Sequence, residues 1–478
     1  MKKGGFVGGT AWTTLSFVVV SIVYILRISI LTRFLDKSDF GLVALVLLVI
    51  GFTNIFADLG VSSALLSQEK VTKKEYSSLF WGSLILSIFL YFFVVFASPF
   101  FAKFYDEDSL NTFIPILGLD LIISSLGRQY AVFKQKELKF KQLAIIKIIS
   151  EVTSLGVACL LAFYNFGVWS LIISLLTTSV MNSILNFILG YQSHPLVFYL
   201  NYSKTKHLYQ IGFYQTGSQV LDYISSQIDI IILGKILPMS DMGVYSVVKN
   251  LVLRIYQSIN QVVTKVAIPI FAKLKGNIVV FREKYLSILS IVTIANTMCY
   301  LAVFLASKET LILFFGQSYA QYSTILKLLC VWGVFSSVLN CTASVVVIST
   351  GRTDLGFKWT QFRLLLNPIF IFVGAYFGGI IGTAISQAIY SFLTIFFYRS
   401  IVIKKILPNF SNFDFVLAIY KPLLVSCIVV FSSIVFKYFF SKLNFFDGVY
   451  INLTVTILFV VLLYLLIFRK MLLSIFRF

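Results

Sequence analysis

Charged residues are scarce in this chain. Only 12% of its 478 residues are Asp, Glu, Lys or Arg, whereas 59% are hydrophobic. Soluble domains carry about 25% charged residues, which cover the surface that faces water. The composition therefore excludes a soluble globular protein, and a domain count from chain length does not apply.

Cysteine and histidine are also rare, and neither residue type is arranged as a metal site. The two histidines, His194 and His207, fall in one loop. The five cysteines are scattered inside apolar runs, at Cys159, Cys299, Cys330, Cys341 and Cys427. This distribution is typical of small buried residues, so we expect neither a metal nor a disulfide framework.

Motifs of common catalytic and nucleotide-binding sites are missing. The nearest fragment of a phosphate-binding loop, Gly234-Lys235, continues with Ile236 instead of Ser or Thr. No nucleophile elbow or zinc-protease motif occurs, and no loop carries the pair of carboxylates expected of a membrane glycosyltransferase. We expect no cofactor, no ATPase activity and no enzymatic function.

Long hydrophobic runs dominate the chain. Fourteen of them are long enough for a helix to cross about 30 Å of hydrocarbon. They are residues 11–33, 40–66, 79–101, 112–133, 143–163, 167–190, 208–234, 242–271, 285–306, 323–349, 360–377, 379–398, 415–439 and 449–468. The first run follows Lys2 and Lys3 as in a signal peptide, but Arg27 interrupts it and no cleavage site is convincing. We expect an uncleaved first helix.

The net charge of +20 comes largely from the short segments between the runs. With the N-terminus in the cytoplasm, 24 Lys and Arg fall on the cytoplasmic side and 7 on the outer side. Cytoplasmic loops of membrane proteins carry such an excess, so both termini are predicted to be cytoplasmic. No basic domain stands apart from the spans, and we therefore expect no nucleic-acid partner.

The chain repeats itself after about two hundred residues. Residues 31–46 read LTRFLDKSDFGLVALV and residues 233–248 read LGKILPMSDMGVYSVV, which aligns Asp39 with Asp241 at an offset of 202. A second match joins GVWS at 167–170 to GIIG at 379–382. Self-similarity of this period indicates a duplicated structural unit. Each unit holds six spans, so both halves have the same orientation about an axis along the membrane normal.

The repeat defines the expected architecture. We predict an all-α membrane protein of about 14 transmembrane helices. Residues 1–200 form an N-lobe with helices 1–6, residues 201–405 form a C-lobe with helices 7–12, and residues 406–478 add a helix pair without a counterpart. The Asp of each Ser-Asp-x-Gly is interpreted as a cap of the second helix of its half, where the glycine allows a tight entry.

Charged residues interrupt several spans. A charge at the bilayer centre costs about 3 kcal/mol on insertion scales, so it normally faces a partner or a watery cavity. The first five spans contain Arg27, Asp58, Asp120, Arg128, Lys147 and Glu151. Asp120, Ser124 and Arg128 follow one another in steps of four and share one side of a helix, and Lys147 and Glu151 are spaced to pair with each other.

Two later spans carry polar stripes. The span at 208–234 contains Gln215, Ser218, Asp222, Ser225 and Asp229 on one helical face. The span at 242–271 contains Asn250, Arg254, Gln257, Gln261 and Lys265, with Lys249 beside them. Single polar residues in such helices often bond to a neighbouring helix. Because these stripes include charges, we favour a water-filled cavity.

Basic residues outnumber acidic ones on these faces, which suits an anionic ligand. Guanidinium groups bind phosphate oxygens in a two-pronged fork, so a diphosphate is favoured over a neutral drug. The predicted substrate-binding residues are Arg27, Arg128, Lys249, Arg254 and Arg363. The predicted polar cavity or coupling residues are Asp58, Asp222, Asp229, Asn250, Gln257 and Gln261. For Arg128 and Arg363 the alternative is that they reach lipid headgroups.

One further hypothesis comes from the repeat. Arg27 and Asp229 occupy equivalent positions at the offset of 202 and carry opposite charges. They could form an ion pair that latches one conformation and releases when a substrate phosphate competes for Arg27.

Two stretches of the chain resemble a known family. They are SDFGLVALVLLVIGFTNIFADLGVSSALLSQ at 38–68 and QKELKFKQLAIIKIISEVTSLGVACLLAFYNFGVWSLI at 135–172. They are similar to the polysaccharide transporters, the Wzx-type exporters of O-antigen and colanic-acid units. These belong to the multidrug/oligosaccharidyl-lipid/polysaccharide exporter superfamily. The resemblance covers the first twelve spans.

The resemblance implies two six-helix lobes in a V shape that work by alternating access in a bacterial inner membrane. It implies a flippase for undecaprenyl-diphosphate-linked oligosaccharides used in O-antigen, capsule or exopolysaccharide synthesis. The diphosphate would bind Arg27, Lys249 and Arg254. The implied partners are this lipid-linked oligosaccharide, membrane lipids, and the polymerase and other polysaccharide-assembly proteins.

Three alternatives stay open at this point. A drug/cation antiporter of the same superfamily would use acidic cavity residues such as Asp58, Asp222 and Asp229. A membrane enzyme, a polymerase or ligase acting on lipid-linked sugar, would need a catalytic outer loop. A flippase for the peptidoglycan precursor would carry a related lipid.

Overall fold

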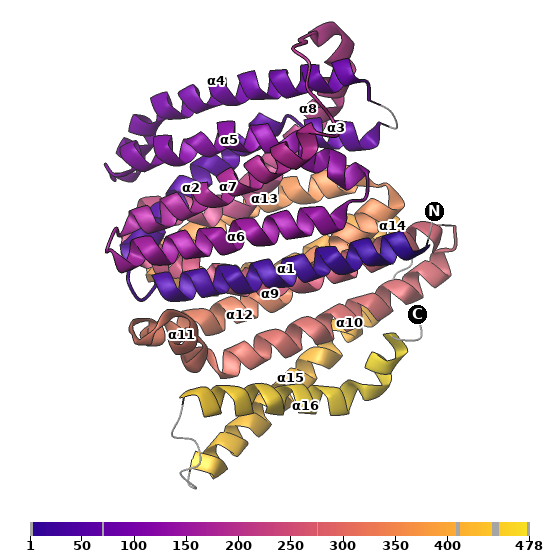
Figure 1. The fold of residues 1–478 in the computed structure, drawn as a ribbon. Helices are drawn as coiled ribbons and strands as arrows, with labels where there is room; N and C mark the ends of the chain where they lie inside the picture. The colour runs from indigo at the N-terminus through magenta and orange to yellow at the C-terminus, as the bar shows by residue number, and fades with distance from the viewer. Residues whose placement is uncertain (1–2, 69–70, 275, 408–411, 442–448, 476–478) are drawn as a thin grey trace. The chain divides into compact units, whose positions relative to one another are not determined.

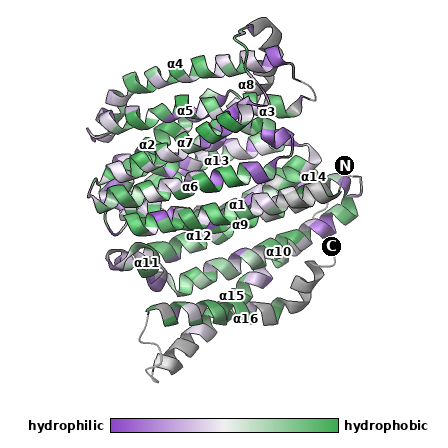
Figure 2. Cartoon of the chain, viewed as in Figure 1, coloured by the Kyte–Doolittle hydropathy of each residue, from purple (hydrophilic) through white to green (hydrophobic). Residues whose placement is uncertain are grey.

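The computed structural model describes residues 3–68, 71–274, 276–407, 412–441 and 449–475. Within these ranges all regular structure is helical and no strand occurs. Apolar residues fill most of each helix, and hydrophilic residues gather towards helix ends and loops (Figure 2). In the described part of the chain, ten helices are long and apolar enough to cross a membrane, which confirms the predicted all-α membrane fold class.

The contacts divide the chain into two compact units, Met1–Gly243 and Val244–Phe478 (Figure 1). The first unit holds α1 (Lys3–Leu31), α2 (Lys37–Asp58), α3 (Val61–Ser67), α4 (Lys73–Tyr105), α5 (Leu110–Lys136), α6 (Phe140–Phe163), α7 (Val168–Tyr191) and α8 (Tyr202–Ile236). The helix α9 (Met239–Leu274) begins in the first unit and continues in the second. The division of the sequence repeat after residue 200 stays a prediction.

The second unit continues from α9 through helices of very different length. They are α10 (Ile278–Leu305), α11 (Ser307–Phe315), the 3-10 helix η1 (Gln317–Tyr322), α12 (Ser323–Thr350), α13 (Thr353–Tyr398), the π-helix η2 (Arg399–Ile403), α14 (Lys404–Ile406), α15 (Asn412–Ser441) and α16 (Val449–Ile475). Its core contains large buried rings, among them Phe271, Tyr285, Tyr398 and Phe415. The last two long helices, α15 and α16, pack on α10 around Val429, Val460 and Tyr464.

Helices lie at all fourteen predicted spans, with three local differences. The span expected at 40–66 is two helices, because Leu59 and Gly60 adopt positive φ angles of 41° and 63° between α2 and α3. The stretch expected as a loop at 307–322 is α11 and η1. The two spans expected at 360–377 and 379–398 both lie in α13, which breaks at Gly378 and Gly379, where φ is −141° and +55°.

The start of α2 refines the capping prediction. Asp39 does accept a hydrogen bond from the backbone N–H of Asp36, at 3.1 Å. However, Asp36 is the residue that precedes the helix, and Asp39 lies in the first helical turn. The motif aspartate thus caps α2 from inside the helix, in the reciprocal arrangement of a capping box.

The segment 192–201 between α7 and α8 begins with a turn, continues without regular structure and is fixed to the first turns of α4. Ser77 Oγ accepts a hydrogen bond from Val197 N at 3.2 Å, and Ser78 Oγ accepts one from Asn201 N at 3.0 Å. Trp81 Nε1 donates to the Val197 carbonyl at 3.1 Å. These bonds satisfy backbone groups of a segment without secondary structure and fix the point from which α8 starts.

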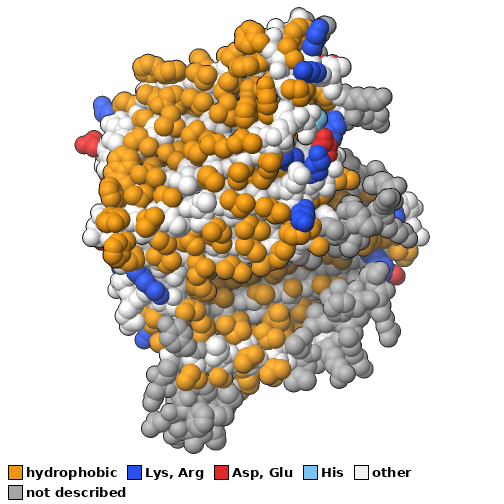
Figure 3. Space-filling view, viewed as in Figure 1, with side chains coloured by type: hydrophobic (Ala, Val, Ile, Leu, Met, Phe, Trp, Pro, Cys, Tyr) orange, Lys and Arg blue, Asp and Glu red, His pale blue; other side chains and the backbone are white. Residues whose placement is uncertain are grey.

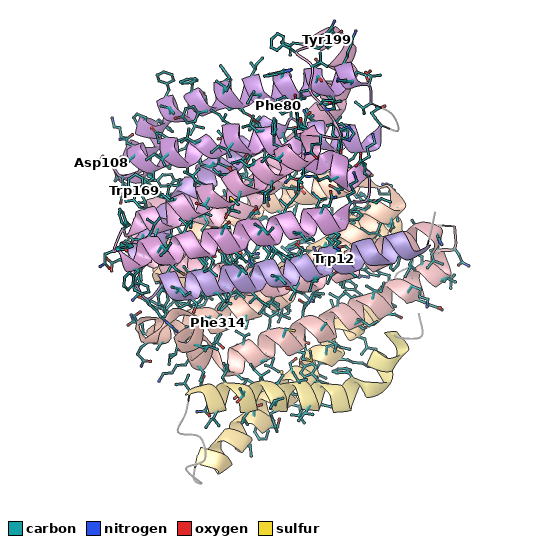
Figure 4. All side chains as sticks on the ribbon, viewed as in Figure 1. Trp12, Phe80, Asp108, Trp169, Tyr199 and Phe314 are labelled. Carbon is teal, nitrogen blue, oxygen red and sulfur yellow. The ribbon has the colours of Figure 1, made fainter. Side chains whose placement is uncertain are left out.

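The same segment is held by an aromatic and ionic cluster at the end of α5. The His194 ring stacks on Phe133 with centroids 4.5 Å apart, and its Nε2 lies 2.8 Å from Glu137 Oε1. Hydrogen bonds from Lys139 and then from His194 hold the pKa of Glu137 below its usual value. Figure 4 labels Tyr199 at this end of the first unit and Asp108 at the opposite end of its helices.

The outer face of the first unit is apolar. Side chains of α4 such as Phe89, Phe96 and Phe100 are exposed, and the space-filling view shows hydrophobic side chains covering this region, with Lys and Arg near the helix ends (Figure 3). An apolar face of this extent is what a helix presents to lipid.

Glycines allow close helix contacts inside the first unit. A methyl group at Gly127 of α5 would overlap the backbone of α7 at Ser183, and one at Gly190 of α7 would overlap the Tyr130 ring of α5. Small residues let helix backbones approach in membranes, where packing drives association. The α5–α7 pair therefore depends on these two positions.

Replacing Gly127 by Ala should destabilise the protein, because overpacking a close contact costs about 1–3 kcal/mol. We expect a melting temperature in detergent several degrees below that of the unchanged protein, measured by thermal unfolding followed with size-exclusion chromatography. Gly156→Ala is the matched control, since Gly156 of α6 has no atom within 4 Å of an added methyl group. Equal melting temperatures of the two variants would contradict the packing role of Gly127.

Candidate functional site

Arg27 of α1 is buried in the first unit and has several partners. Its Nη1 donates a hydrogen bond to Ser154 Oγ at 2.7 Å and lies 3.7 Å from Glu151 Oε2. Both partners belong to α6, and the guanidinium also lies 5.5 Å from the Tyr24 ring. The exposed fraction of Arg27 is only 4%. Its charge is therefore neutralised inside the first unit.

This arrangement corrects two expectations. Glu151 pairs with Arg27, whereas Lys147 is exposed, so the expected pair of Lys147 with Glu151 is wrong among the described residues. Among the described residues, Arg27 does not pair with Asp229, so the hypothesised ion-pair latch is not formed in this structure. The physical reason is proximity, because α1 packs along α6 and brings Glu151 to Arg27.

A second charged group joins α2 and α5. Asp120 accepts hydrogen bonds from Asn54 Nδ2 at 2.9 Å and from Ser124 Oγ at 2.7 Å. Arg128 Nη2 donates to Asn54 Oδ1 at 3.2 Å, and its Nη1 lies 3.9 Å from Asp58 Oδ1. The three residues expected on one side of the helix do share it. The guanidinium of Arg128 thus lies against Asn54 and Asp58 of α2.

The polar stripe of α8 is graded in exposure. Ser218 and Asp222 are exposed, whereas Ser225 and Asp229 are buried. Asp229 Oδ1 accepts a hydrogen bond from the backbone N–H of Ile230 at 2.9 Å. The side chain of Gln215 lies outside the described residues. A wet cavity beside the Asp222 end of the stripe stays a prediction.

The stripe of α9 is graded in the same way. Lys249 is buried at 7% exposure and Arg254 is half-buried, whereas Asn250 and Gln257 are exposed. The predicted cavity residue Gln261 has a side chain outside the described residues. Basic and amide side chains on one face of α9 therefore include groups that can reach a polar ligand.

The helix α13 contributes a third polar region, in the second unit. The Arg363 guanidinium lies beside the hydroxyl of Tyr390, from the second half of the same helix, and close to Tyr256 of α9. One helical turn further along, Gln387 Nε2 donates to Asn367 Oδ1 at 3.2 Å. In contrast to Arg27 and Arg128, the neighbours given for Arg363 among the described residues are the two tyrosines, and no Asp or Glu occurs between Asp354 and Asp414.

Charge is thus distributed unequally between the two units. The predicted spans within α2, α5, α6 and α8 contain five carboxylates, at Asp58, Asp120, Glu151, Asp222 and Asp229. The predicted spans within α9, α12 and α13 contain no carboxylate and five cations, at Lys249, Arg254, Lys265, Lys327 and Arg363. The acidic residues of these three helices, Asp241 and Asp354, lie in first turns. Within the spans, the predicted cation surplus belongs to the second unit alone.

The comparison with protein families is decisive. The family model described as "Polysaccharide biosynthesis protein" matches residues 30–324. The chain belongs to this family. The match confirms the family that residues 38–68 and 135–172 indicated.

Relatives of this family resemble the chain over most of its length. The "Teichuronic acid biosynthesis protein TuaB" of Bacillus subtilis (strain 168) is 26% identical over 418 residues, 87% of this chain and 86% of that protein. The "Lipopolysaccharide biosynthesis protein WzxC" of Escherichia coli (strain K12) is 23% identical over 424 residues, 88% of this chain and 85% of that protein.

A solved structure shares the fold. The "Lipid II flippase MurJ, inward closed conformation" superposes with a TM-score of 0.75 at 14% sequence identity, covering 98% of this chain and 100% of that one. The similarity extends over α15 and α16, beyond the residues that the family model matches.

Several residues of these polar regions were not found from the sequence. Ser154, Asn54, Tyr256 and Tyr390 are neutral residues on apolar helices, and nothing in their spacing distinguishes them from other hydroxyl or amide side chains. Arg27 and Glu151 are 124 positions apart, so only the packing of α1 on α6 joins them. Among the described residues, no three His, Cys, Asp or Glu side chains come together as metal ligands.

The Arg27–Glu151 pair can be tested with charge-neutral variants. Removing one partner of a buried ion pair costs about 3–5 kcal/mol, because the other charge is left uncompensated. We expect Arg27→Gln and Glu151→Gln each to lower the melting temperature in detergent. The double variant should recover most of the loss, because no unpaired charge remains.

A double variant as unstable as the sum of the single changes would contradict the pairing. If the double variant recovers its stability, its export activity distinguishes a structural role of Arg27 from a role in the substrate path. Normal export means that Arg27 is structural, whereas absent export in a stable double variant assigns it to the substrate path.

Proposed function

We propose that this protein is a flippase that moves undecaprenyl-diphosphate-linked oligosaccharide units across the bacterial inner membrane for surface polysaccharide synthesis. Membership of the polysaccharide biosynthesis family supports this proposal, as do relatives named for teichuronic acid and lipopolysaccharide synthesis. The fold shared with a lipid II flippase is consistent with a lipid-linked substrate. In this proposal the protein is a transporter and carries out no chemistry on the sugar.

The observation that carries the proposal is the excess of cations over carboxylates in α9, α12 and α13. A diphosphate brings negative charge to membrane depth, where it needs positive partners in place of water. Arginine supplies two parallel hydrogen bonds to phosphate oxygens. Arg254 and Arg363 are half-buried, and the proposed diphosphate site therefore uses these two residues together with Lys249.

Arg27 and Arg128 have a different role in this proposal. Both guanidinium groups already have carboxylate neighbours in the first unit. They stabilise the packing of α1 on α6 and of α2 on α5. They also contribute to the charge of the first-unit side of the proposed glycan path. The exposed side chains of Asp222, Asn250 and Gln257 provide hydrogen-bonding groups for sugar hydroxyls or for a coupling ion.

The proposed orientation has both termini in the cytoplasm. The end of the first unit at Tyr199 carries Lys74, Lys136 and Lys139, and the opposite end carries the acidic residues 106–108. This asymmetry matches the excess of basic residues in cytoplasmic loops. The lipid-linked oligosaccharide would then enter from the Tyr199 end and leave at the Asp108 end, by alternating access between the duplicated halves 1–200 and 201–405.

One alternative function is favoured by a specific observation. Inside the predicted spans 40–66, 112–133 and 208–234, four carboxylates stand beside a single basic residue, Arg128, which suits a cation. In a drug/cation antiporter these residues would hold the transported ligand, whereas in the proposed flippase they would hold a coupling ion.

Replacing Arg254 or Arg363 by Ala should abolish most export while the protein stays inserted. A hydrogen bond to a charged group is worth about 1.5–3 kcal/mol, so each change should slow substrate transfer roughly 10- to 100-fold. The measurement is surface polysaccharide, with lipid-linked oligosaccharide accumulating inside the cell. Tyr390→Phe should give a smaller loss, because it removes only the hydroxyl beside Arg363.

Lys147→Ala is the matched control, because Lys147 is an exposed cation of α6 outside the proposed site. Its surface polysaccharide should be normal. Normal export by both Arg254→Ala and Arg363→Ala would refute the proposed diphosphate site. Expression of the unchanged protein in a drug-sensitive strain tests the alternative, and resistance of that strain to cationic drugs would favour the antiporter.

A further inference from the structure

The two Ser-Asp-x-Gly motifs of the sequence repeat lie against each other in the first unit. A methyl group at Gly41 would overlap the carbonyl oxygen of Met239, and one at Gly243 would overlap the carbonyl oxygen of Lys37. Each glycine is also close to the backbone nitrogen of the other. The first turns of α2 and α9 thus meet backbone to backbone, at a separation that no other residue type allows.

This contact has the symmetry of the repeat. Gly41 and Gly243 are related by the offset of 202 residues, and so are their contact partners Lys37 and Met239. The contact of Gly41 with Met239 is therefore the same contact as that of Gly243 with Lys37. Symmetric contacts of this kind lie on the twofold axis that relates two copies. These contacts fit a pseudo-twofold axis of the predicted duplication between the two helix starts.

A close seam continues from the glycine pair along α2 and α8. Gly234 of α8 lies under Leu45 of α2, so that a methyl group there would overlap the Leu45 side chain. Further along, the Tyr223 ring lies over Gly51, and its hydroxyl lies 3.0 Å from the carbonyl of Leu48. We use "seam" for these contacts from Lys37 to Gly51. At 1.5 Å per residue it is about 21 Å long.

The exposure of polar side chains changes along the two helices of the seam. Within it, Leu45 is fully buried and Leu48 is 9% exposed. Just beyond Gly51, Asn54 and Asp58 of α2 are partly exposed. On α8, Ser218 and Asp222 lie beyond Tyr223 and are exposed. On α2 the side chains named here are thus apolar beside the seam and polar beyond it. On α8 the polar side chains Ser225 and Asp229 are buried beside the seam, whereas Ser218 and Asp222 are exposed beyond it.

We propose that this seam is the outer closure of the transport path, and that the Gly41–Gly243 contact is the point at which the duplicated halves seal on their common axis. The inference rests on the proposed function for its direction, because the proposed topology places Lys37 and Met239 on the outer side. When the path opens outwards, the two helix starts separate. When they meet again, the absence of side chains at both glycines lets the carbonyls of Lys37 and Met239 approach.

An added methyl group at either glycine prevents this approach. The obstacle is a backbone carbonyl, which cannot rotate away as a side chain can. The clash exists only in the closed state, so the change shifts the population towards the state open to the outside. Tyr223→Phe weakens the seam without any clash, because it removes only the hydroxyl near the α2 backbone.

The experiment measures access to the polar region from outside. In a cysteine-free background, Ser218→Cys is labelled in intact cells by a membrane-impermeant maleimide. We expect Gly41→Ala and Gly243→Ala each to raise the labelling rate at least about tenfold, which corresponds to 1.4 kcal/mol. Tyr223→Phe should raise it by a smaller factor.

Gly156→Ala and Gly217→Ala are the controls, since neither added methyl group has an atom within 4 Å. Their labelling rates should equal that of the unchanged reporter. Unchanged labelling in both Gly41→Ala and Gly243→Ala would overturn the inference. If these variants fail to insert, the Tyr223→Phe variant decides, and an unchanged rate in it overturns the inference equally.

The test is independent of the substrate. Labelling uses a small thiol reagent, so a seam that responds to the glycine changes stands even if export of polysaccharide proves unaffected by Arg254→Ala. In that case the proposed function fails and the closure remains. If export requires Arg254 but the labelling rates do not change, the closure fails and the proposed function remains.

Discussion

Charge at membrane depth is the constraint on which the rest of this structure depends. A charged side chain in the hydrocarbon region needs an opposite charge, several hydrogen bonds or water. The first unit satisfies the requirement internally, through Arg27 with Glu151 and through Arg128 with Asp58. The second unit has basic side chains in α9 and α13 and no acidic residue inside those helices beyond their first turns. In the proposed function, the diphosphate of the substrate supplies the negative charge that balances this excess.

A transport path for a large polar headgroup must also be able to close. In the proposed mechanism, the glycine contacts between α2 and α9 provide this closure. A side-chain seam between helices can leak, because side chains rotate. A backbone contact such as that of Gly41 with Met239 is set by the helices themselves. The duplication supplies two copies of the same short motif, and their meeting on the axis gives a closure that is symmetric without any additional element.

Much of the fold could be predicted from the sequence. Apolar runs of about twenty residues determine helices in a membrane, and helices lie at all fourteen expected positions. The repeat at residues 31–46 and 233–248 pointed to paired motifs, although their contact could not be read from the residues. The break at Leu59 and Gly60 was missed, because an Asp-Leu-Gly sequence does not by itself distinguish a helix end from a continuous span.

The candidate site was less predictable, because pairing in a helical bundle depends on which helices are neighbours. Arg27 looked free in the sequence since Glu151 is far away in the chain, and the nearer Lys147 looked like the partner of Glu151. Arg363 looked like a residue that reaches headgroups, and its neighbours Tyr256 and Tyr390 carry no charge that would attract notice. Spacing along one helix predicts a shared face, as for Asp120 and Arg128, but it cannot predict contacts between helices.

The most direct measurement of the account reconstitutes the purified protein in lipid vesicles with a fluorescent undecaprenyl-diphosphate oligosaccharide. Transfer between leaflets is followed by the fraction of sugar that an added glycosidase can reach. The account predicts transfer of the diphosphate lipid and none of a glycolipid with the same sugar and no phosphate. Equal transfer of the two lipids, or transfer of neither, would contradict recognition of the diphosphate by the basic residues of α9 and α13.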